Sequence, residues 1–142
     1  MFWETRLDRP GSTPAGFEAE TIFESPVLEY IPENPLVVFI LVEIPPGGET
    51  SVHSHPGPEF IYQLSGGIDY HDDIIGVRKM LAGDGQGLPP FTAAHTRNHS
   101  ADTAVFLSCY LVDTEKAFAS PASFTDAGLR HNSALLQNGS PG

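Results

Sequence analysis

Apolar residues occur in short runs along this chain, and turn-forming residues separate the runs. The longest run, PLVVFILVEIP at 35–45, is rich in Val and Ile and bounded by prolines, which favours a strand over a helix. Further runs follow in EFIYQLS, IDYH, IIGVRKML and AVFLSCYLV, and they are separated by PGP, GG, DD and AGDGQG. Glycine, aspartate and proline favour tight turns. Many short strands at regular spacing predict an all-β fold, an antiparallel barrel or sandwich.

The two ends of the chain are less regular than this middle part. Residues 1–34 contain two short apolar pieces, ETIFES and VLEYI, which we expect to add edge strands. Residues 35–115 contain the regular runs and form the expected barrel. Small and polar residues dominate 116–142, with a weak helical pattern at 127–136, so we expect a loosely ordered tail there. A length of 142 residues without an internal repeat predicts one domain.

The charge of the chain limits its partners. Seven basic residues stand against eighteen acidic ones, for a net charge of −11. Such a surface repels nucleic-acid phosphate and anionic lipid, so we expect neither nucleic acid nor a membrane as a partner. The chain does not open on a signal-peptide pattern, and no run reaches the roughly 18 apolar residues of a membrane helix. These features indicate a cytoplasmic protein.

One segment, HSHPGPEFIYQLSGG at 53–67, concentrates side chains that bind metal ions. His53 and His55 are two residues apart, so they project from the same face of a strand. The PGP turn then brings Glu59 onto the next strand, where Gln63 shares its face. Two imidazoles and a carboxylate from adjacent strands form most of the inner shell of a metal ion. A fourth ligand is expected from HTRNH at 95–99.

The sequence GETSVHSHPGPEFIYQLSG resembles the first motif of the cupin superfamily. Its glycines and its three candidate ligands all stand at the spacing of that motif: Gly47, His53, His55, Glu59 and Gly66. The resemblance covers about residues 36–112. It implies a double-stranded β-helix, which is a jelly-roll barrel, with a mononuclear metal site inside.

The second motif of that family is only partly present. Three of its residues keep their register: Gly83, Pro89 and Asn98. Phe91 replaces a glycine, and Ala94 stands where the motif has its histidine. His95 comes one residue late and takes the ligand's place if one residue is inserted in PPFTAA, where a bulky Phe91 indicates a rebuilt loop. We therefore expect His95, rather than His99, to be the fourth ligand.

The resemblance also implies a cofactor and a partner. We expect one divalent metal ion per chain, held by His53, His55, Glu59 and His95. Iron or manganese is favoured, and nickel, zinc or copper suits the same ligands. Cupins of this kind commonly pair through sheet edges, which implies a homodimer.

The fold does not fix the reaction. We favour a non-haem dioxygenase acting on a small aromatic or enolic substrate, because four protein ligands leave two octahedral positions open for the substrate and O₂. Glu59 is the candidate catalytic base, and Gln63 and Phe91 are candidate contacts to the substrate. One alternative is a non-redox metal-dependent isomerase, lyase or decarboxylase, in which the metal acts as a Lewis acid. The other is a ligand-binding cupin without catalysis.

Overall fold

The structure, a computed structural model, describes residues 16–125. In this part the chain forms nine strands and no helix. The strands are β1 (Pro35–Ile44), β2 (His53–Ser54), β3 (Glu59–Ser65), β4 (Gly67–Asp72), β5 (Gly76–Leu81), β6 (Gly85–Leu88), β7 (Ala94–Arg97), β8 (Ala104–Asp113) and β9 (Ser120–Pro121). The all-β class predicted from the apolar runs is confirmed. None of the described residues belongs to a helix that would span a membrane.

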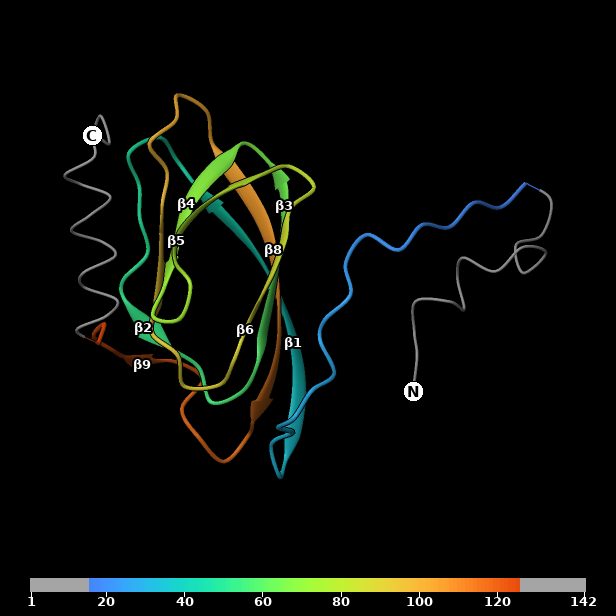
Figure 1. The fold of residues 1–142 in the computed structure, drawn as a ribbon, viewed down its shortest axis with the longest axis vertical. Coiled ribbons are helices and arrows are strands. Elements are labelled where there is room, and N and C mark those ends of the chain that lie inside the picture. The colour runs from blue at the N-terminus through green and yellow to red at the C-terminus, as the bar shows by residue number, and fades with distance from the viewer. Residues whose placement is uncertain (1–15, 126–142) are drawn as a thin grey trace.

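The strands form two antiparallel sheets. One sheet has the order β1-β8-β3-β6, and the other has the order β5-β4-β7-β2-β9. Figure 1 shows β4, β5, β2 and β9 on one side of the molecule, and β1, β3, β6 and β8 on the other. The longest ladder joins β1 to β8 from Pro35↔Asp113 to Ile44↔Ala104.

Alternation along the strands sends one set of side chains between the sheets. On β8, Ala104, Phe106, Ser108 and Tyr110 are buried, and the residues between them are only half-buried. The buried core draws on both sheets and consists of Ile44, Ile61, Ile68, Tyr70, Met80, Leu88, Ala94, Ala104 and Phe106. The space between the sheets is therefore mostly apolar.

A side chain joins the two sheets where their edge strands β5 and β6 meet. Arg78 lies on β5, and its Nη1 donates to the carbonyl oxygen of Gly85 (3.1 Å) and to Oε1 of Gln86 (2.6 Å) on β6. Arg78 is paired in register with Tyr70 on β4, so both side chains lie on the inner face of their sheet. The guanidinium group thus bridges an edge that no backbone ladder closes.

The N-terminal part of the chain differs from the expectation. Residues 16–34 form no strand, so the edge strands expected in ETIFES and VLEYI are wrong. The segment instead packs against the barrel through individual side chains. One example is Phe23, whose ring centroid lies 6.0 Å from that of Phe60 on β3. Pro26 and Pro32 each lack the N–H that a ladder needs, which explains the absence of pairing.

The expected C-terminal tail is held against the barrel in its first part. β9 pairs with β2 through His53↔Pro121 and Ser54↔Ser120. Beyond β9, the backbone N–H of Thr125 donates to Oδ1 of Asp73 (2.8 Å). The helical pattern at 127–136 lies outside the described residues.

Candidate functional site

A cavity of about 240 Å³ lies between the two sheets. Its walls are mainly apolar, and Ile40, Ile61 and Phe106 contribute to them from the four-stranded sheet. The predicted ligands His53, His55 and Glu59 line one part of it. Because the lining is mainly apolar, the few polar groups in this cavity are available to each other and to a ligand.

The turn after β2 brings a histidine and a glutamate together. Gly57 is required there, because a Cβ at this position would lie 1.7 Å from the carbonyl oxygen of Leu111. The turn places Glu59 at the start of β3, with its Oε1 3.8 Å from Nε2 of His55. Both side chains are buried. Prediction and structure therefore agree that these two groups meet.

Backbone carbonyls orient both histidines of the HxH pair. Nδ1 of His53 donates to the carbonyl oxygen of Ser51 (2.7 Å), and Nδ1 of His55 donates to that of Phe118 (2.8 Å). A carbonyl only accepts, so Nδ1 carries the hydrogen and Nε2 keeps its lone pair. Nε2 of His55 is buried and makes no hydrogen bond within the described part of the chain. This is the arrangement found in metal-binding histidines.

Burial shifts the ionisation of both groups. Loss of hydration lowers the pKa of His55; the carbonyl of Phe118 opposes the shift, and the nearby His53 adds to it. Burial raises the pKa of Glu59, against the hydroxyls of Tyr110 and Ser108, which favour its ionised form. The imidazole of His55 is therefore neutral near pH 7, as a metal ligand must be.

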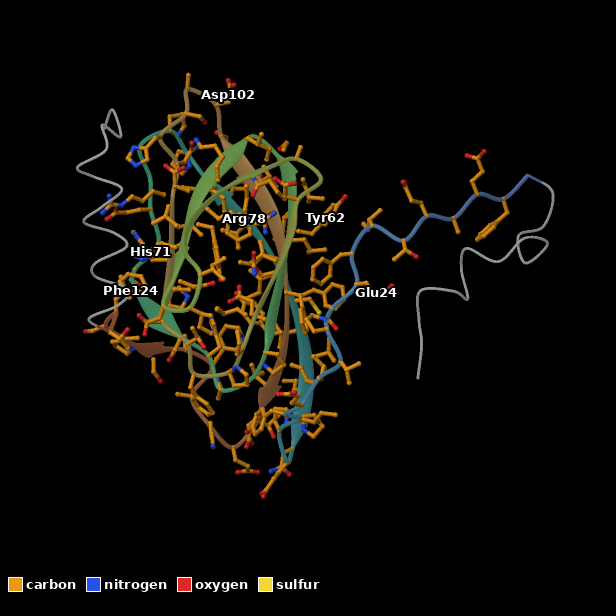
Figure 2. The ribbon with its side chains drawn as sticks, in the orientation of Figure 1. Glu24, Tyr62, His71, Arg78, Asp102 and Phe124 are labelled. Carbon is orange, nitrogen blue, oxygen red and sulfur yellow. The ribbon has the colours of Figure 1, made fainter. Side chains whose placement is uncertain are left out.

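His95 lines the same cavity as these residues, but it lies on the opposite face of β7 from Ala94 and Thr96. In the ladder between β4 and β7, His71 pairs with His95 and Tyr70 pairs with Thr96. Paired residues share a face, and Tyr70 and Thr96 line the cavity. His95 borders the cavity, yet its ring packs 6.1 Å from His71 and 6.2 Å from Phe124. Figure 2 shows His71 and Phe124 at the outer side of the sheet, with Arg78 between the sheets.

The loop before β7 explains why His95 faces away. Phe91 takes a positive φ of 58°, the conformation that a glycine favours, and its N–H donates to the carbonyl oxygen of His55 (2.8 Å). The loop thus has no inserted residue, in contrast to the expectation for PPFTAA. Ala94, which pairs with His53, lines the cavity instead. The inner position expected for a fourth ligand carries a methyl group.

The other predicted site residues lie elsewhere. Nε2 of His99 is 3.7 Å from Oδ2 of Asp69, outside the barrel. Gln63 faces inward but does not line the cavity, and its amide donates to the carbonyl oxygen of Ser65 (2.8 Å). Phe91 is 57% exposed and also lies outside the lining.

Four aromatic residues of the cavity were not among the predicted site residues: Tyr70, Phe106, Tyr110 and Phe118. Tyr70 and Tyr110 line it from β4 and β8, and Phe118 lines it from the segment before β9. Strand alternation places the tyrosines on an inner face once the register of their strands is known. No local pattern marks Phe118, whose ring contacts His55 and Tyr110, each at 4.9 Å between centroids.

The donor chemistry of the site fits a metal ion in part. Between residues 16 and 125 no three His, Cys, Asp or Glu side chains stand together as a ready metal site. His53 and His55 nevertheless have their Nδ1 atoms tethered, and Nε2 of His55 lies unbonded beside Glu59. These three side chains are the ones that would hold a divalent ion.

Comparison with protein families and solved structures agrees with this architecture. Residues 40–110, half of the 142-residue chain, match the family described as cupin domain. No curated protein matches the sequence. The crystal structure of an uncharacterized conserved protein with a double-stranded β-helix domain from Klebsiella pneumoniae has a TM-score of 0.55. It is 22% identical over 70% of this chain and 99% of its own.

Two enzymes also have this fold. A DMSP lyase from Ruegeria pomeroyi has a TM-score of 0.55 and 22% identity, over 61% of this chain and 43% of the lyase. An oxalate decarboxylase from Lactobacillus farciminis has a TM-score of 0.53 and 21% identity, over 60% of this chain and 26% of the decarboxylase. This chain therefore spans less than half of either enzyme. The likeness establishes the double-stranded β-helix predicted from the sequence.

Proposed function

Since the chain belongs to the cupin domain family, we propose that it is a metal-dependent enzyme whose ion is bound by His53, His55 and Glu59. The observation that carries this proposal is the buried Nε2 of His55, which has no hydrogen bond in the described part of the chain and lies 3.8 Å from the Glu59 carboxylate. A buried nitrogen without a partner is costly, and a metal ion would satisfy it. We expect one divalent ion per chain, with iron or manganese favoured.

The ligand set favours oxygen chemistry. Two imidazoles and one carboxylate, with open positions around the metal, are the set used by non-haem iron oxygenases. Ala94 on the inner face leaves this set without a fourth protein ligand. When bound, such an ion supplies a centre that activates both O₂ and a chelating substrate oxygen. We therefore propose a dioxygenase acting on a small aromatic or enolic compound.

The protein's own residues have distinct roles in this proposal. Ile40, Ile61 and Phe106 exclude water from the apolar part of the cavity. Glu59 is the buried carboxylate placed to accept a proton from the substrate at Oε1 or Oε2. The carbonyl of Phe118 holds the ring of His55 in orientation.

A second candidate is a non-redox lyase or decarboxylase. The observation that favours it is the similarity in fold to a DMSP lyase and to an oxalate decarboxylase. Lyase and decarboxylase reactions are redox-neutral overall, and Glu59 would serve as the acid–base group in such a reaction as well.

The first test is metal content. The protein is purified under anaerobic conditions, reconstituted with Fe(II) or Mn(II), desalted and assayed for metal. We expect about one ion per chain in the wild type and in His99→Ala, and none in His55→Ala. Wild-type protein that retains no stoichiometric metal would overturn the metal-dependent enzyme.

The second test separates the two reaction classes. Metal-loaded protein is incubated with small aromatic, enolic and carboxylic compounds, with O₂ and under strict exclusion of O₂. Consumption of O₂ in step with substrate supports the dioxygenase. Conversion that is equally fast without O₂ eliminates it and supports the lyase or decarboxylase. Glu59→Gln should lower turnover more than it lowers metal content.

A further inference from the structure

Tyr70 faces the candidate metal ligands across the cavity. It lies on β4 in the five-stranded sheet, whereas Glu59 lies on β3 in the four-stranded sheet, and both line the same cavity. Tyr70 is 1% exposed. Burial and then the charges of Asp72 and Glu59 raise the pKa of Tyr70 above its usual range. The phenol is therefore a permanent hydrogen-bond donor at any working pH.

The Tyr70 hydroxyl is not engaged by the protein in a well-formed hydrogen bond. It is buried without a partner of good geometry in the described part of the chain. The carboxylate of Asp72, on the same face, interacts with this hydroxyl and adds to the rise of its pKa, while Oδ1 of Asp72 accepts the N–H groups of Ile74 and Ile75, each at 2.7 Å. Buried hydroxyls are normally satisfied, so one that is not indicates a missing ligand or water.

A positive charge stands beside this hydroxyl. Arg78 is paired with Tyr70 and faces the interior from β5. Among residues 16–125 it is the only Arg or Lys on the inner face of a strand, since Lys79 and Arg97 both pair with Asp69 on the outer face. The contacts with Gly85 and Gln86 fix the guanidinium in place. Arg78 itself does not line the cavity, and the buried Asp72 carboxylate shares its face, so the positive charge of Arg78 acts on the cavity through Tyr70.

We propose that Tyr70 donates a hydrogen bond to a negatively charged oxygen of the substrate, a carboxylate or an enolate, and that Arg78 supplies the positive charge behind it. Tyr70 contacts the substrate, and Arg78 is a positioning residue. This inference rests on the proposed function, because it places the substrate between Tyr70 and the ligands His53, His55 and Glu59.

The size of the cavity narrows the substrate class. A volume of about 240 Å³, at about 30 Å³ for each water-sized group, holds roughly eight non-hydrogen atoms. Small monocarboxylic acids of about this size are the chemical class that fits, and benzoate, with nine non-hydrogen atoms, tests the upper limit. Their uncharged amides have the same shape and are the matched probes.

The experiment measures binding without turnover. Propionate, benzoate and the two amides are titrated by calorimetry under anaerobic conditions into Mn(II)-loaded and chelator-treated protein. Tyr70→Phe removes only the donor, and Tyr62→Phe on the opposite face of β3 is the control. Arg78→Gln removes the charge, and circular dichroism checks its fold.

We expect the acids to bind the wild type more tightly than the amides. Tyr70→Phe should weaken acid binding by at least about 10-fold, because hydrogen bonds to charged groups are the stronger kind, and it should weaken the binding of the amides less, because a neutral carbonyl accepts a weaker hydrogen bond. Tyr62→Phe should behave as the wild type. The inference is overturned if neither acid binds, if acid and amide bind equally, or if Tyr70→Phe binds the acids as well as the wild type.

The two proposals fail in different ways. Protein that holds no metal but binds acids through Tyr70 overturns the metal-dependent enzyme and supports the anion site. Protein that holds metal but shows no difference between the wild type and Tyr70→Phe overturns only the anion site.

Discussion

At the scale of single residues, the backbone of Phe91 decides what faces the cavity. Its φ of 58° lies in the left-handed region, which is uncommon for residues with a Cβ. The hydrogen bond from its N–H to the carbonyl oxygen of His55 holds the loop in this conformation. The strand that follows therefore turns Ala94 inward and His95 outward.

This arrangement predicts the effect of adding a ligand. Ala94→His places an imidazole on the inner face, so we expect Mn(II) affinity to rise by at least about 10-fold, the scale on which ligand environments change metal affinity. His95→Ala should bind Mn(II) as the wild type does. The affinities are measured by competition with a chelator. Loss of metal in His95→Ala would contradict the assignment of this residue to the outer face.

The buried Glu59 predicts a pH dependence of stability in chelator-treated protein. Burial raises its pKa in the folded state, so the folded protein keeps the proton to higher pH than the unfolded chain does. This contribution to stability is present below the carboxyl's ordinary pKa of about 4.3 and is lost as pH rises through the folded-state value. Glu59→Gln replaces the carboxyl by an amide that does not titrate, so it removes this pH dependence of stability.

We therefore expect Glu59→Gln to be more stable than the wild type at pH 7 by about 1–3 kcal/mol, the scale of the desolvation cost of a buried polar group, which the hydroxyls of Tyr110 and Ser108 offset only in part. The difference should shrink toward pH 4. Urea denaturation of both chelator-treated proteins at the two pH values measures it. A difference that is the same at both pH values would show that Glu59 does not titrate between them.

At the scale of elements, the segment 118–125 contributes one wall of the site through Phe118 and Ala119. Phe118 orients His55 through its carbonyl and covers His55 and Tyr110 with its ring. The only ladder of this segment is the two-residue strand β9, whose residues are both exposed. A short exposed ladder gives little stability by itself. The contacts of the Phe118 ring with His55 and Tyr110 therefore contribute much of the free energy that holds this segment against the barrel.

Phe118→Ala should therefore affect the site more than the fold. We expect Mn(II) affinity to fall by about 10-fold, because the group that orients a ligand is loosened, and the free energy of unfolding to fall by about 1 kcal/mol. Phe17→Ala, at an exposed position remote in sequence, is the control. Chelator competition and urea denaturation provide the two values. Unchanged metal affinity would mean that Phe118 does not help to orient His55 as a metal ligand.

The strands and the first ligand motif were predictable because their signals are local. Apolar runs between turn residues identified β1, β3 and β8, and the HxH pair with Glu59 stood at a recognisable spacing. The expectation for His95 depended on one extra residue in the loop before it, and a shift of one residue reverses the face of a strand. The backbone conformation of Phe91, which sets that register, cannot be read from residue types.

Other features depended on contacts between distant parts of the chain. The bond from His55 to Phe118 spans 63 positions in the sequence, so the composition of the C-terminal segment did not reveal it. ETIFES and VLEYI have the composition of strands, but a strand also needs a neighbour to pair with. Local composition carries no information about such a neighbour.

At the scale of the whole molecule, the outer face of β1 is apolar and exposed. Val37, Phe39 and Leu41 are 58%, 65% and 59% exposed on this edge strand. Soluble proteins rarely leave an apolar edge strand uncovered. We propose that a second copy of the chain covers it, in a homodimer.

Light scattering at micromolar concentration should therefore give twice the mass of the chain. Phe39→Lys should raise the dimer dissociation constant by about 10-fold or more, since it puts a charge at the centre of the apolar contact. Leu81→Lys, at a comparably exposed position on β5, should leave the mass unchanged. A monomeric wild type would contradict the dimer.

The contacts of Arg78 between β5 and β6 also affect how easily the barrel opens transiently between these two strands. Both strands are sheet edges, whereas β8 is paired on both sides. Transient opening should therefore begin at this seam, so that amide hydrogens of β5 and β6 exchange with deuterium sooner than those of β8. Because Arg78 also lies beside Tyr70, an acid held there would keep the seam closed. Slower exchange in β5 and β6 on adding benzoate would reveal ligand binding as a stiffening of the barrel.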